Sequence, residues 1–489
     1  MHVFKKMVAL LLLAVMVLSL CACGKEKDKG NGGSGENSAL SGKFSAGFGK
    51  VDITPKENVP LDSYGDAEHR ISTGLLSYMY ALAVAVTDTD GNSLIFVVGD
   101  QSWCSPSLQG QIRTEITNRT GVPGDHIVLS GTHTHAAPAP GLTENPAQAR
   151  YNVQYTKGMV DAAVMAMEDR KPAKVYAGGV DTEKMNFVRR YIMDDGSLTG
   201  DNAVGTGTKI ERHETIADPE LQLLKFVREG GKDIVIGNFQ AHPHLEGYRK
   251  ELSSQTVGAF REAMEKVADV HCMHWQGAAG NLNSHSRMDE NIFEQSPEGR
   301  KKYGEKMAEY AMSVYNDLEE VKTGPVRVIS KIYEGKVNHE WDSKADVAQK
   351  IVDTWKSTNN KNKAMALAGD SKIGSVYHAN RIVGNSKKGA TEDMYQFACS
   401  FGDVGFIVMC YEMFDTNGMY VKEESPFERT FLIGYSAAGD GSSAKGYIPS
   451  ALGWENRGYE TDNSLYVGGT GEVLAQRYVD MLTELYNAK

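Results

Sequence analysis

The fold of this chain is constrained most strongly by short apolar runs of strand length, each of which ends in a polar loop. Residues 80–87 (YALAVAVT) and 94–98 (LIFVV) form one pair of such runs, and the Asp90-Gly91 turn between them is typical of a tight hairpin. Residues 404–410 (VGFIVMC) form another run of this kind. Because apolar runs of this length are typical of buried strands, the pattern predicts a protein built around β-sheets.

Segments with the periodicity of helices alternate with these runs. Leu108, Ile112 and Ile116 recur at four-residue spacing, which places them on one face of a helix. Further helices are expected over residues 151–169, 253–267, 299–318 and 471–486. The mixture of hairpins with strand-loop-helix units predicts an α/β fold in which mixed β-sheets are flanked by helices, with one domain over residues 43–489.

Composition and charge narrow the functional class. The 489 residues are 41% hydrophobic and carry a formal net charge of −11, with no cluster of basic residues. This composition is typical of a globular protein. The sequence has no basic cluster that would bind the phosphates of nucleic acid, so no nucleic-acid partner is expected. Six cysteines in a chain of this length do not make a disulfide scaffold, and buried thiols are expected for most of them.

The N-terminus has the pattern of a lipoprotein signal. A short basic segment precedes an apolar run of signal-peptide length, and LCACG follows it. This motif resembles a bacterial lipobox, in which Cys23 fits the lipidated position better than Cys21. We expect residues 1–23 to be the signal peptide and lipobox, and the charged, Gly/Ser-rich residues 24–42 to be a flexible tether. A lipid anchor would attach the secreted protein to the outer face of the bacterial cytoplasmic membrane, or hold it in the periplasm.

Two H-x-H motifs, each directly after a strand-like run, are the strongest chemical signal. His133 and His135 lie in GTHTHAAPAPG, and His242 and His244 lie in NFQAHPHLEG. An H-x-H pair directs both imidazoles to the same side of an extended chain, which suits a metal or a metal with a neighbouring base. Loops that follow strands are also where α/β sheets usually build sites. The motifs therefore indicate a metal site, and the alternative is a set of surface or structurally bonded histidines.

Candidate partners for such a metal occur at other strand ends. Glu412 follows the run VGFIVMC, where a carboxylate is costly to bury unless it is paired or metal-bound. In MHWQGAAGNLN, small residues permit close approach of the backbone, and Asn281 offers an amide that would polarise an oxyanion. Arg189 and Arg190 are adjacent, so strand alternation would direct one into a site and leave the other solvated.

Together these segments resemble the neutral (alkaline, non-lysosomal) ceramidase family, zinc amidases that split the fatty-acyl amide of ceramide. The resemblance covers residues 46 to about 475 and is most specific in the HTH loop and in residues 445–460. The segments that carry it are AGFGKVDITP, LSGTHTHAAP, NFVRR, ADPELQLLKF, NFQAHPH and KGYIPSALGWENRGYE. The resemblance implies the mixed α/β fold of the ceramidase catalytic domain, without the C-terminal immunoglobulin-like domain of many relatives.

The resemblance also implies a set of zinc ligands. The ligands of the family match His133, His242, Glu412 and Tyr447 of this sequence. The residue patterns above point to the two histidines and the glutamate as well, whereas Tyr447 is implied by the resemblance alone. A phenol next to zinc either binds the ion or donates a proton to an oxyanion.

Further active-site positions of the family fall on His135, Arg189 and Tyr459. His135 is expected to transfer a proton to the leaving nitrogen, Arg189 to support the substrate carbonyl or the zinc site, and Tyr459 to act as an oxyanion donor. Zinc would lower the pKa of a bound water toward ~7, so that the water attacks the carbonyl. The predicted function is zinc-dependent hydrolysis of an N-acyl amide such as ceramide, and spacing alone does not distinguish zinc from another divalent ion.

The chain departs from the family pattern at two places. The family has a catalytic serine in GDVSPN, whereas this chain has GAAGN over residues 277–281 and no hydroxyl there. The turn that carries the acid is CYEMFDTNG in place of PGEFTT. These departures bear on ceramide as the substrate more than on the metal. Two alternatives therefore stay open: the same zinc site acting on a soluble ester, amide or sugar-linked substrate, and a non-catalytic substrate-binding lipoprotein.

Overall fold

The computed structural model describes residues 40–488, except for 65–66, 68, 140, 202–208, 290–292 and 438–445. Gly42–Lys489 form one compact unit by themselves. The signal peptide, Cys23 and nearly all of the predicted tether lie outside the described residues, so these assignments stay predictions. Within the described ranges, no helix has both the length and the apolar character that crossing a bilayer requires.

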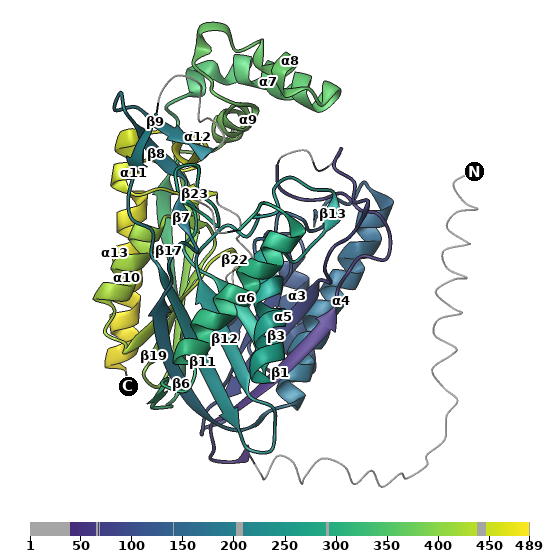
Figure 1. Cartoon of the computed structure of the whole chain (residues 1–489), viewed down its shortest axis with the longest axis vertical. Helices are drawn as coiled ribbons and strands as arrows, with labels where there is room; N and C mark the ends of the chain where they lie inside the picture. Colours follow the sequence, from purple (N-terminus) through teal and green to yellow (C-terminus); the bar gives the residue numbers. More distant parts are fainter. Residues whose placement is uncertain are drawn as a thin grey trace, which may run out of the picture. The chain divides into compact units, whose positions relative to one another are not determined.

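The larger sheet runs through the middle of the unit in the order β14-β12-β11-β6-β1-β3-β4-β5-β22, with β16 beside β6 (Figure 1). Its two halves meet between β1 and β6 through only the pairs Ser45↔Pro172 and Ala46↔Lys171. The strands are β1 (Ser45–Asp52), β3 (Tyr80–Thr87), β4 (Ser93–Gly99), β5 (Ile127–Gly131), β6 (Lys171–Asp181), β11 (Glu220–Arg228), β12 (Ile234–Phe239), β14 (His271–Gln276), β16 (Glu319–Val321) and β22 (Ser436–Ala437).

A smaller sheet packs against one face of the larger one. Its order is β17 (Val326–Lys336), β18 (Thr391–Phe401), β19 (Val404–Met409) and β21 (Arg429–Ile433). Along β3, Leu82 and Val84 pack into the core between the sheets, which also contains Phe406 of β19. The period-2 alternation of strand side chains thus explains how one strand serves two cores, because Ala81 and Ala83 pack under helices on the opposite face.

Helices cover both outer faces of this pair of sheets (Figure 1). The larger sheet carries α3 (Gln109–Thr120), α4 (Pro146–Glu168), α5 (Gln255–Ala268) and α6 (Pro297–Val314), and the smaller one carries α10 (Asp415–Glu424) and α13 (Thr470–Asn487). In β1, a Cβ atom at Gly49 would lie 2.0 Å from the Ala162 carbonyl oxygen, so glycine permits the close packing of α4. The predicted α/β fold with mixed sheets flanked by helices is confirmed.

A helical lobe is inserted between β17 and β18. These two strands pair along their whole length, from Val326↔Phe401 to Lys336↔Thr391. The lobe contains α7 (Ala345–Thr358), α8 (Lys361–Met365) and α9 (Val376–Asn385), which share a small core around Trp355. The sequence patterns above did not predict this lobe, and it matters because α9 contributes to the candidate site.

Short elements complete the fold. They are β2 (Gly74–Leu75), β7 (Phe187–Val188), β8 (Arg190–Met193), β9 (Leu198–Gly200), β10 (Ile210–His213), β13 (Glu251–Leu252), β15 (Leu282–Asn283), β20 (Glu412–Met413), β23 (Tyr447–Ile448), α11 (Ala451–Asn456) and α12 (Tyr459–Asp462). Turns of 3₁₀ helix occur at Gly124–His126, Asp342–Lys344 and Gly369–Ser371. The cysteines of the described part, Cys104, Cys272, Cys399 and Cys410, are all buried, as predicted.

Candidate metal centre

His133 lies just after β5, where the chain turns sharply at the end of the sheet. Its backbone adopts the left-handed conformation with φ of 61°, which is uncommon for residues other than glycine and is concentrated at functional sites. The imidazole is buried, and its Nδ1 atom lies 3.0 Å from the Ser102 carbonyl oxygen. The ring also stacks on Tyr435, with 3.8 Å between the ring centroids. These contacts fix the ring and leave Nε2 available to a ligand.

His242 follows β12 and is enclosed by the glycine- and alanine-rich loop. Its Nδ1 atom lies 2.9 Å from the Ala279 carbonyl oxygen and 3.0 Å from that of Leu282. The absence of a side chain at Gly280 lets the loop approach the backbone of Glu412. A Cβ atom at this position would lie only 2.6 Å from the Glu412 carbonyl oxygen. Gly280 thus lets this loop pack against the backbone of Glu412, and the predicted close approach of the loop to a ligand stays a prediction.

Glu412 is the first residue of β20, which pairs in parallel with β23. Its Oε2 atom lies 3.3 Å from Nε2 of His242 and 3.6 Å from Nε2 of His133. Burial raises the pKa of this carboxyl to about 8. The structure therefore brings together His133, His242 and Glu412, which are far apart along the chain.

The donor atoms of this cluster fit a divalent cation. In both His133 and His242, Nδ1 faces a backbone carbonyl, so the proton belongs on Nδ1 and the lone pair of Nε2 faces the cluster. Within the described residues, Nε2 of His242 and Oε2 of Glu412 are buried without a hydrogen-bond partner. Burial lowers the pKa of His133 to about 3, and the pKa of His242 well below its usual value. Neutral imidazoles and unpartnered buried acceptors are what metal binding requires.

His135 belongs to the same cluster. Its Nε2 atom lies 3.2 Å from Nε2 of His133, and the ligand atoms of His133, His135 and His242 all lie within 4.8 Å of one another. Burial lowers the pKa of His135 well below its usual value, so this ring is also neutral. His135 is therefore within reach of the same ion, and it also lines the cavity where a substrate would sit.

Tyr447 and Arg189 adjoin the cluster on the side of Glu412. Tyr447 is opposite Glu412 in the β20–β23 register, and its hydroxyl hydrogen-bonds to the Glu412 side chain. Arg189 Nη2 donates to the Tyr447 hydroxyl at 3.0 Å and to the Gly280 carbonyl at 2.9 Å. Arg189 Nε donates to Glu460 Oε1 at 2.9 Å. Arg189 thus holds Tyr447 beside the cluster.

Arg190 contradicts the expectation that one arginine of the pair is solvated. Its side chain has no solvent exposure and forms ion pairs with Glu214, at 2.6 Å, and with Glu460, at 2.8 Å. Because Glu460 binds Arg189 through its other oxygen, one buried carboxylate holds both arginines. Strand alternation gives the face on which a side chain lies, but it does not give what covers that face.

The amide of Asn281 does not face the cluster. Its Nδ2 atom donates to Asp415 Oδ1 at 2.7 Å, and its Oδ1 atom accepts the backbone N–H of Asp415 at 3.0 Å. This pair of hydrogen bonds ties the loop that encloses His242 to the start of α10. Asn281 is therefore a brace of that loop, and the predicted role as an oxyanion donor is not supported by its contacts.

Two further histidines lie around the cluster: His244, which the H-x-H motif predicted near a metal site without a separate role, and His285, which the sequence analysis did not select. The ring of His244 lies 4.7 Å from that of His135, and burial lowers the pKa of His244 to about 3. His285 adjoins His244, with 5.9 Å between the ring centroids, and its Nε2 atom lies 3.0 Å from Asp201 Oδ2. His244 was visible as the second histidine of the HPH motif, whereas nothing in the sequence around His285 distinguishes it.

A cavity of about 380 Å³ opens onto the metal cluster. The residues that line it are Asp62, Ser63, Tyr64, Trp103, His133, His135, Tyr377, Asn380, Arg381, Glu412, Gly446, Tyr447, Tyr459 and Asn463. Tyr459, the predicted oxyanion donor, is among them, and its ring lies 5.7 Å from that of Tyr447. None of these described residues has an aliphatic side chain, so the lining is polar and aromatic. Three of them, Tyr377, Asn380 and Arg381, come from α9 of the helical lobe.

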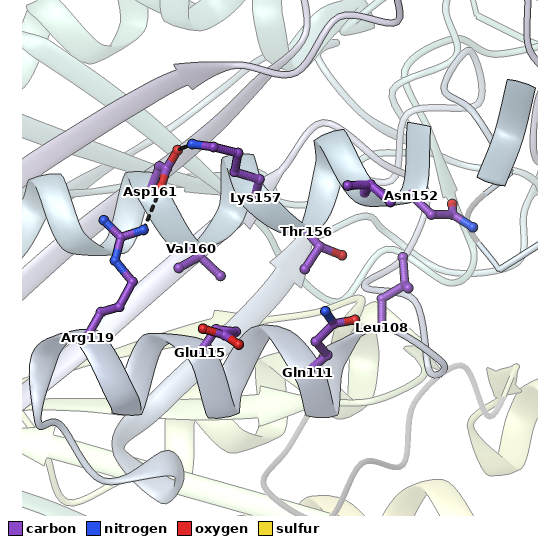
Figure 2. A pocket seen from close by; sticks show the side chains of 10 residues that line it. Leu108, Gln111, Glu115, Arg119, Asn152, Thr156, Lys157, Val160 and Asp161 are labelled. Carbon is purple, nitrogen blue, oxygen red and sulfur yellow. Dashed lines mark hydrogen bonds and ion pairs between the residues drawn. The ribbon is translucent and has the colours of Figure 1, made fainter. Parts of the chain in front are cut away.

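A second pocket, between α3 and α4, lacks the chemistry of a metal site (Figure 2). It has a volume of about 310 Å³ and contains no histidine or cysteine among the described residues that line it. Asp161 pairs there with Arg119, at 2.7 Å, and with Lys157. The Asp161 carboxylate is therefore already paired with two cations.

Comparisons with known proteins relate part of the sequence to one family. Residues 44–278 match the family described as neutral/alkaline non-lysosomal ceramidase, N-terminal. The neutral ceramidase of Drosophila melanogaster is 29% identical over 102 residues, and that of Drosophila pseudoobscura pseudoobscura is 30% identical over 101 residues. Each match covers 20% of this chain and only 14% of the relative's length.

Solved structures extend the likeness to most of the chain. The crystal structure of neutral ceramidase from Pseudomonas aeruginosa superposes with a TM-score of 0.68 at 16% identity, covering 91% of this chain and 75% of that one. A structure of ceramidase complexed with C2 gives a TM-score of 0.66 at 15% identity, covering 91% and 76%. At these identities the superpositions establish a shared fold.

Proposed function

We propose that this chain, a distant member of the neutral/alkaline non-lysosomal ceramidase family through residues 44–278, is a zinc-dependent hydrolase of an N-acyl amide bond. The observation that supports this most directly is the meeting of His133, His242 and Glu412 in a cluster of which His133 and Glu412 line a cavity. Imidazole and carboxylate donors of this kind suit zinc. When bound, zinc polarises a carbonyl and lowers the pKa of water toward ~7.

The residues around the cluster have distinct roles in this proposal. His133, His242 and Glu412 hold the ion, and the Tyr447 hydroxyl beside Glu412 is the fourth donor. Burial raises the pKa of Tyr447 well above its usual value, so in the metal-free protein the phenol keeps its proton. Arg189 orients Tyr447 through the 3.0 Å hydrogen bond. The contact fixes the hydroxyl before substrate arrives, which lowers the reorganisation needed in the transition state.

Two residues of the cavity would act on the substrate itself. His135 lines the cavity and is neutral, so it is suited to accept a proton and return it to the leaving nitrogen. Tyr459 lines the same cavity, and burial raises the pKa of its phenol, so it is suited to donate a hydrogen bond to the developing oxyanion. No serine hydroxyl is needed for these roles, which is consistent with the GAAGN loop.

Two substrate classes are candidates. Ceramide-like lipids are the substrates implied by the family, and a lipid anchor at Cys23 would place the enzyme at a membrane surface. The second candidate is a soluble amide, ester or sugar-linked compound. The cavity favours this second class, because its described lining has no aliphatic side chain to receive an acyl chain.

Hydrolysis assays on full-length, zinc-loaded protein test this proposal. Fluorescent N-acyl sphingosine, short-chain N-acyl amides and simple esters are compared for the wild type and for Glu412→Gln. We expect turnover of at least one amide by the wild type, loss of turnover in the variant, and loss and recovery on chelation and zinc addition. No turnover of any substrate, together with a ligand-dependent rise in melting temperature, would instead support a substrate-binding lipoprotein.

The lipid anchor is a separate proposal. It is based on the apolar run and the LCACG motif. Incorporation of labelled palmitate by the wild type and not by Cys23→Ser would support it, and equal incorporation would contradict the assignment of Cys23.

A further inference from the structure

We infer that Arg381 binds an acidic group of the substrate, a carboxylate or a phosphate, beside the scissile amide. This inference rests on the proposed function and adds to it a substrate class: anionic, polar N-acyl amides in place of neutral lipids. It assigns the helical lobe a part in substrate selection, because Arg381 belongs to α9.

The position of Arg381 places its guanidinium next to the metal cluster. Arg381 lines the cavity together with Glu412 and Tyr447. A Cβ atom at Gly446 would lie 2.8 Å from Arg381 Nη2, so the guanidinium lies directly against the residue that precedes Tyr447. The carbonyl oxygen of Gly446 accepts the backbone N–H of Glu412 at 2.9 Å. A substrate held at the cluster would therefore have Arg381 as a near neighbour.

The Arg381 side chain makes no hydrogen bond or ion pair with another residue in the part of the chain that the structure describes. Burial lowers the pKa of its guanidinium, and the attraction of nearby groups such as Glu412 offsets this effect only in part. Arg189 differs from Arg381 because its pKa is raised. Burial also disfavours the Arg189 cation, but Tyr447, Glu460 and Glu412 outweigh this effect and raise its pKa. Arg189 is thus saturated by the protein, whereas Arg381 has donors left for a ligand.

The charges that line the cavity also favour an anion. The carboxylates of the lining are Asp62 and Glu412. Asp62 is already occupied, because it accepts hydrogen bonds from the Ser102 hydroxyl and, at 2.7 Å, from the Ser63 backbone N–H. Glu412 would face a cation bound at the cluster, so neither carboxylate of the described lining is left for Arg381. A guanidinium is also the group whose planar fork matches a carboxylate or phosphate in two parallel hydrogen bonds.

The size and lining of the cavity favour a compact polar leaving group over a bulky apolar one. A volume of about 380 Å³ is near the lower end for small-molecule sites. Its described lining offers hydroxyl, amide and imidazole groups and aromatic rings, but no aliphatic side chain. A compact amine that carries an acid, such as an amino acid or an amino alkyl phosphate, suits these contacts.

Matched substrates measured on full-length, zinc-loaded protein test this inference. The substrates are N-benzoyl amino acids with one, two or three methylenes between the amide nitrogen and the carboxylate, each with its neutral carboxamide, and N-benzoyl ethanolamine phosphate with its parent alcohol. We expect the best acidic member to exceed its neutral partner about 10- to 100-fold in kcat/KM, the range of one charge-assisted hydrogen bond. Arg381→Gln should remove this preference, so that the acidic member and its neutral partner have similar kcat/KM values.

Lys356→Gln is the matched control, because Lys356 is an exposed cation of the same lobe on α7. It should keep the preference. A preference that survives in Arg381→Gln, or no preference in the wild type, would overturn the inference. The carboxylate and phosphate pairs show separately which acid is the ligand.

A binding measurement separates this inference from the proposed function. 3-Benzoylpropionate and 3-benzoylpropionamide replace the amide nitrogen by carbon and are not hydrolysed. Calorimetric titration should show tighter binding of the acid by about tenfold or more in the wild type and in Lys356→Gln, and equal binding in Arg381→Gln. If the acid binds preferentially but no amide is cleaved, the hydrolase proposal fails and the anion site stands. Equal binding of both compounds by the wild type would refute the anion site.

Discussion

Replacing Arg190 by methionine tests the ion-pair network beneath the candidate active site. Arg190 has no solvent exposure, and its guanidinium binds Glu214 through two hydrogen bonds of 2.6 and 2.9 Å and Glu460 through one of 2.8 Å. Glu460 in turn binds Arg189, which holds Tyr447. The substitution therefore leaves two buried carboxylates short of positive charge.

The expected cost follows from this burial. Removing one partner of a buried ion pair typically destabilises a protein by about 3–5 kcal/mol, because the remaining charge stays in a low-dielectric environment. Arg189 still compensates Glu460 in the variant, and Asn456 still donates to Glu214 at 2.8 Å. We therefore expect a loss of about 3 kcal/mol in the free energy of unfolding, the lower end of that range. Urea denaturation of the wild type and Arg190→Met measures this difference.

The chain offers a control with the same geometry at the surface. Arg150 binds Glu57 through two hydrogen bonds of 2.7 Å each, and both side chains are exposed. Exposed pairs contribute little to stability, so Arg150→Met should leave the free energy of unfolding nearly unchanged. A change for Arg190→Met below about 1 kcal/mol, or one equal to that of Arg150→Met, would refute the argument from burial.

Three further outcomes are expected. Elemental analysis should show that His133→Ala loses zinc, and this variant should be inactive. His135→Ala should keep zinc and lose about 10²- to 10⁴-fold in kcat. Loss of zinc in both variants would make His135 a ligand. Asn281→Ala should lower the free energy of unfolding by about 1–3 kcal/mol with little effect on kcat of the zinc-loaded enzyme, and the reverse pattern would restore the oxyanion role. Burial lowers the pKa of His274 to about 3. Between this value and pH 6.5 only the unfolded chain therefore binds the proton, so the contribution of His274 to stability should fall by about 2 kcal/mol between pH 7 and pH 5. In urea titrations, His274→Phe should reduce the pH-dependent loss of stability by about this amount, and an unchanged loss would contradict the assignment.

Much of the fold was predictable because its determinants are local. The hairpin over residues 80–98 follows from two apolar runs and the Asp90-Gly91 turn, and the structure has β3 and β4 there. The helical lobe was not predictable from these patterns. It interrupts a strand pair that is joined across residues 337–390, and sequence gives no sign that β17 and β18 are partners.

The candidate site, like the fold, was predictable only where its determinants are local in the sequence. The H-x-H motifs pointed to His133, His135, His242 and His244, and an acid after an apolar run pointed to Glu412, which is costly to bury without a ligand. The resemblance to the family then singled out His133 and His242. The burial of Arg190 and the exposure of Arg381 to the cavity depend on which elements cover them. Those contacts join segments far apart in the chain, so a single sequence does not contain them.

Anomalous scattering at the zinc absorption edge, from crystals grown with zinc, tests the central claim most directly. We expect one peak per chain, about 2.0–2.2 Å from Nε2 of His133, Nε2 of His242 and a carboxylate oxygen of Glu412. The same peak should be absent from His242→Ala. A peak elsewhere in the molecule, or none at a zinc concentration that supports hydrolysis, would contradict the metal centre described above.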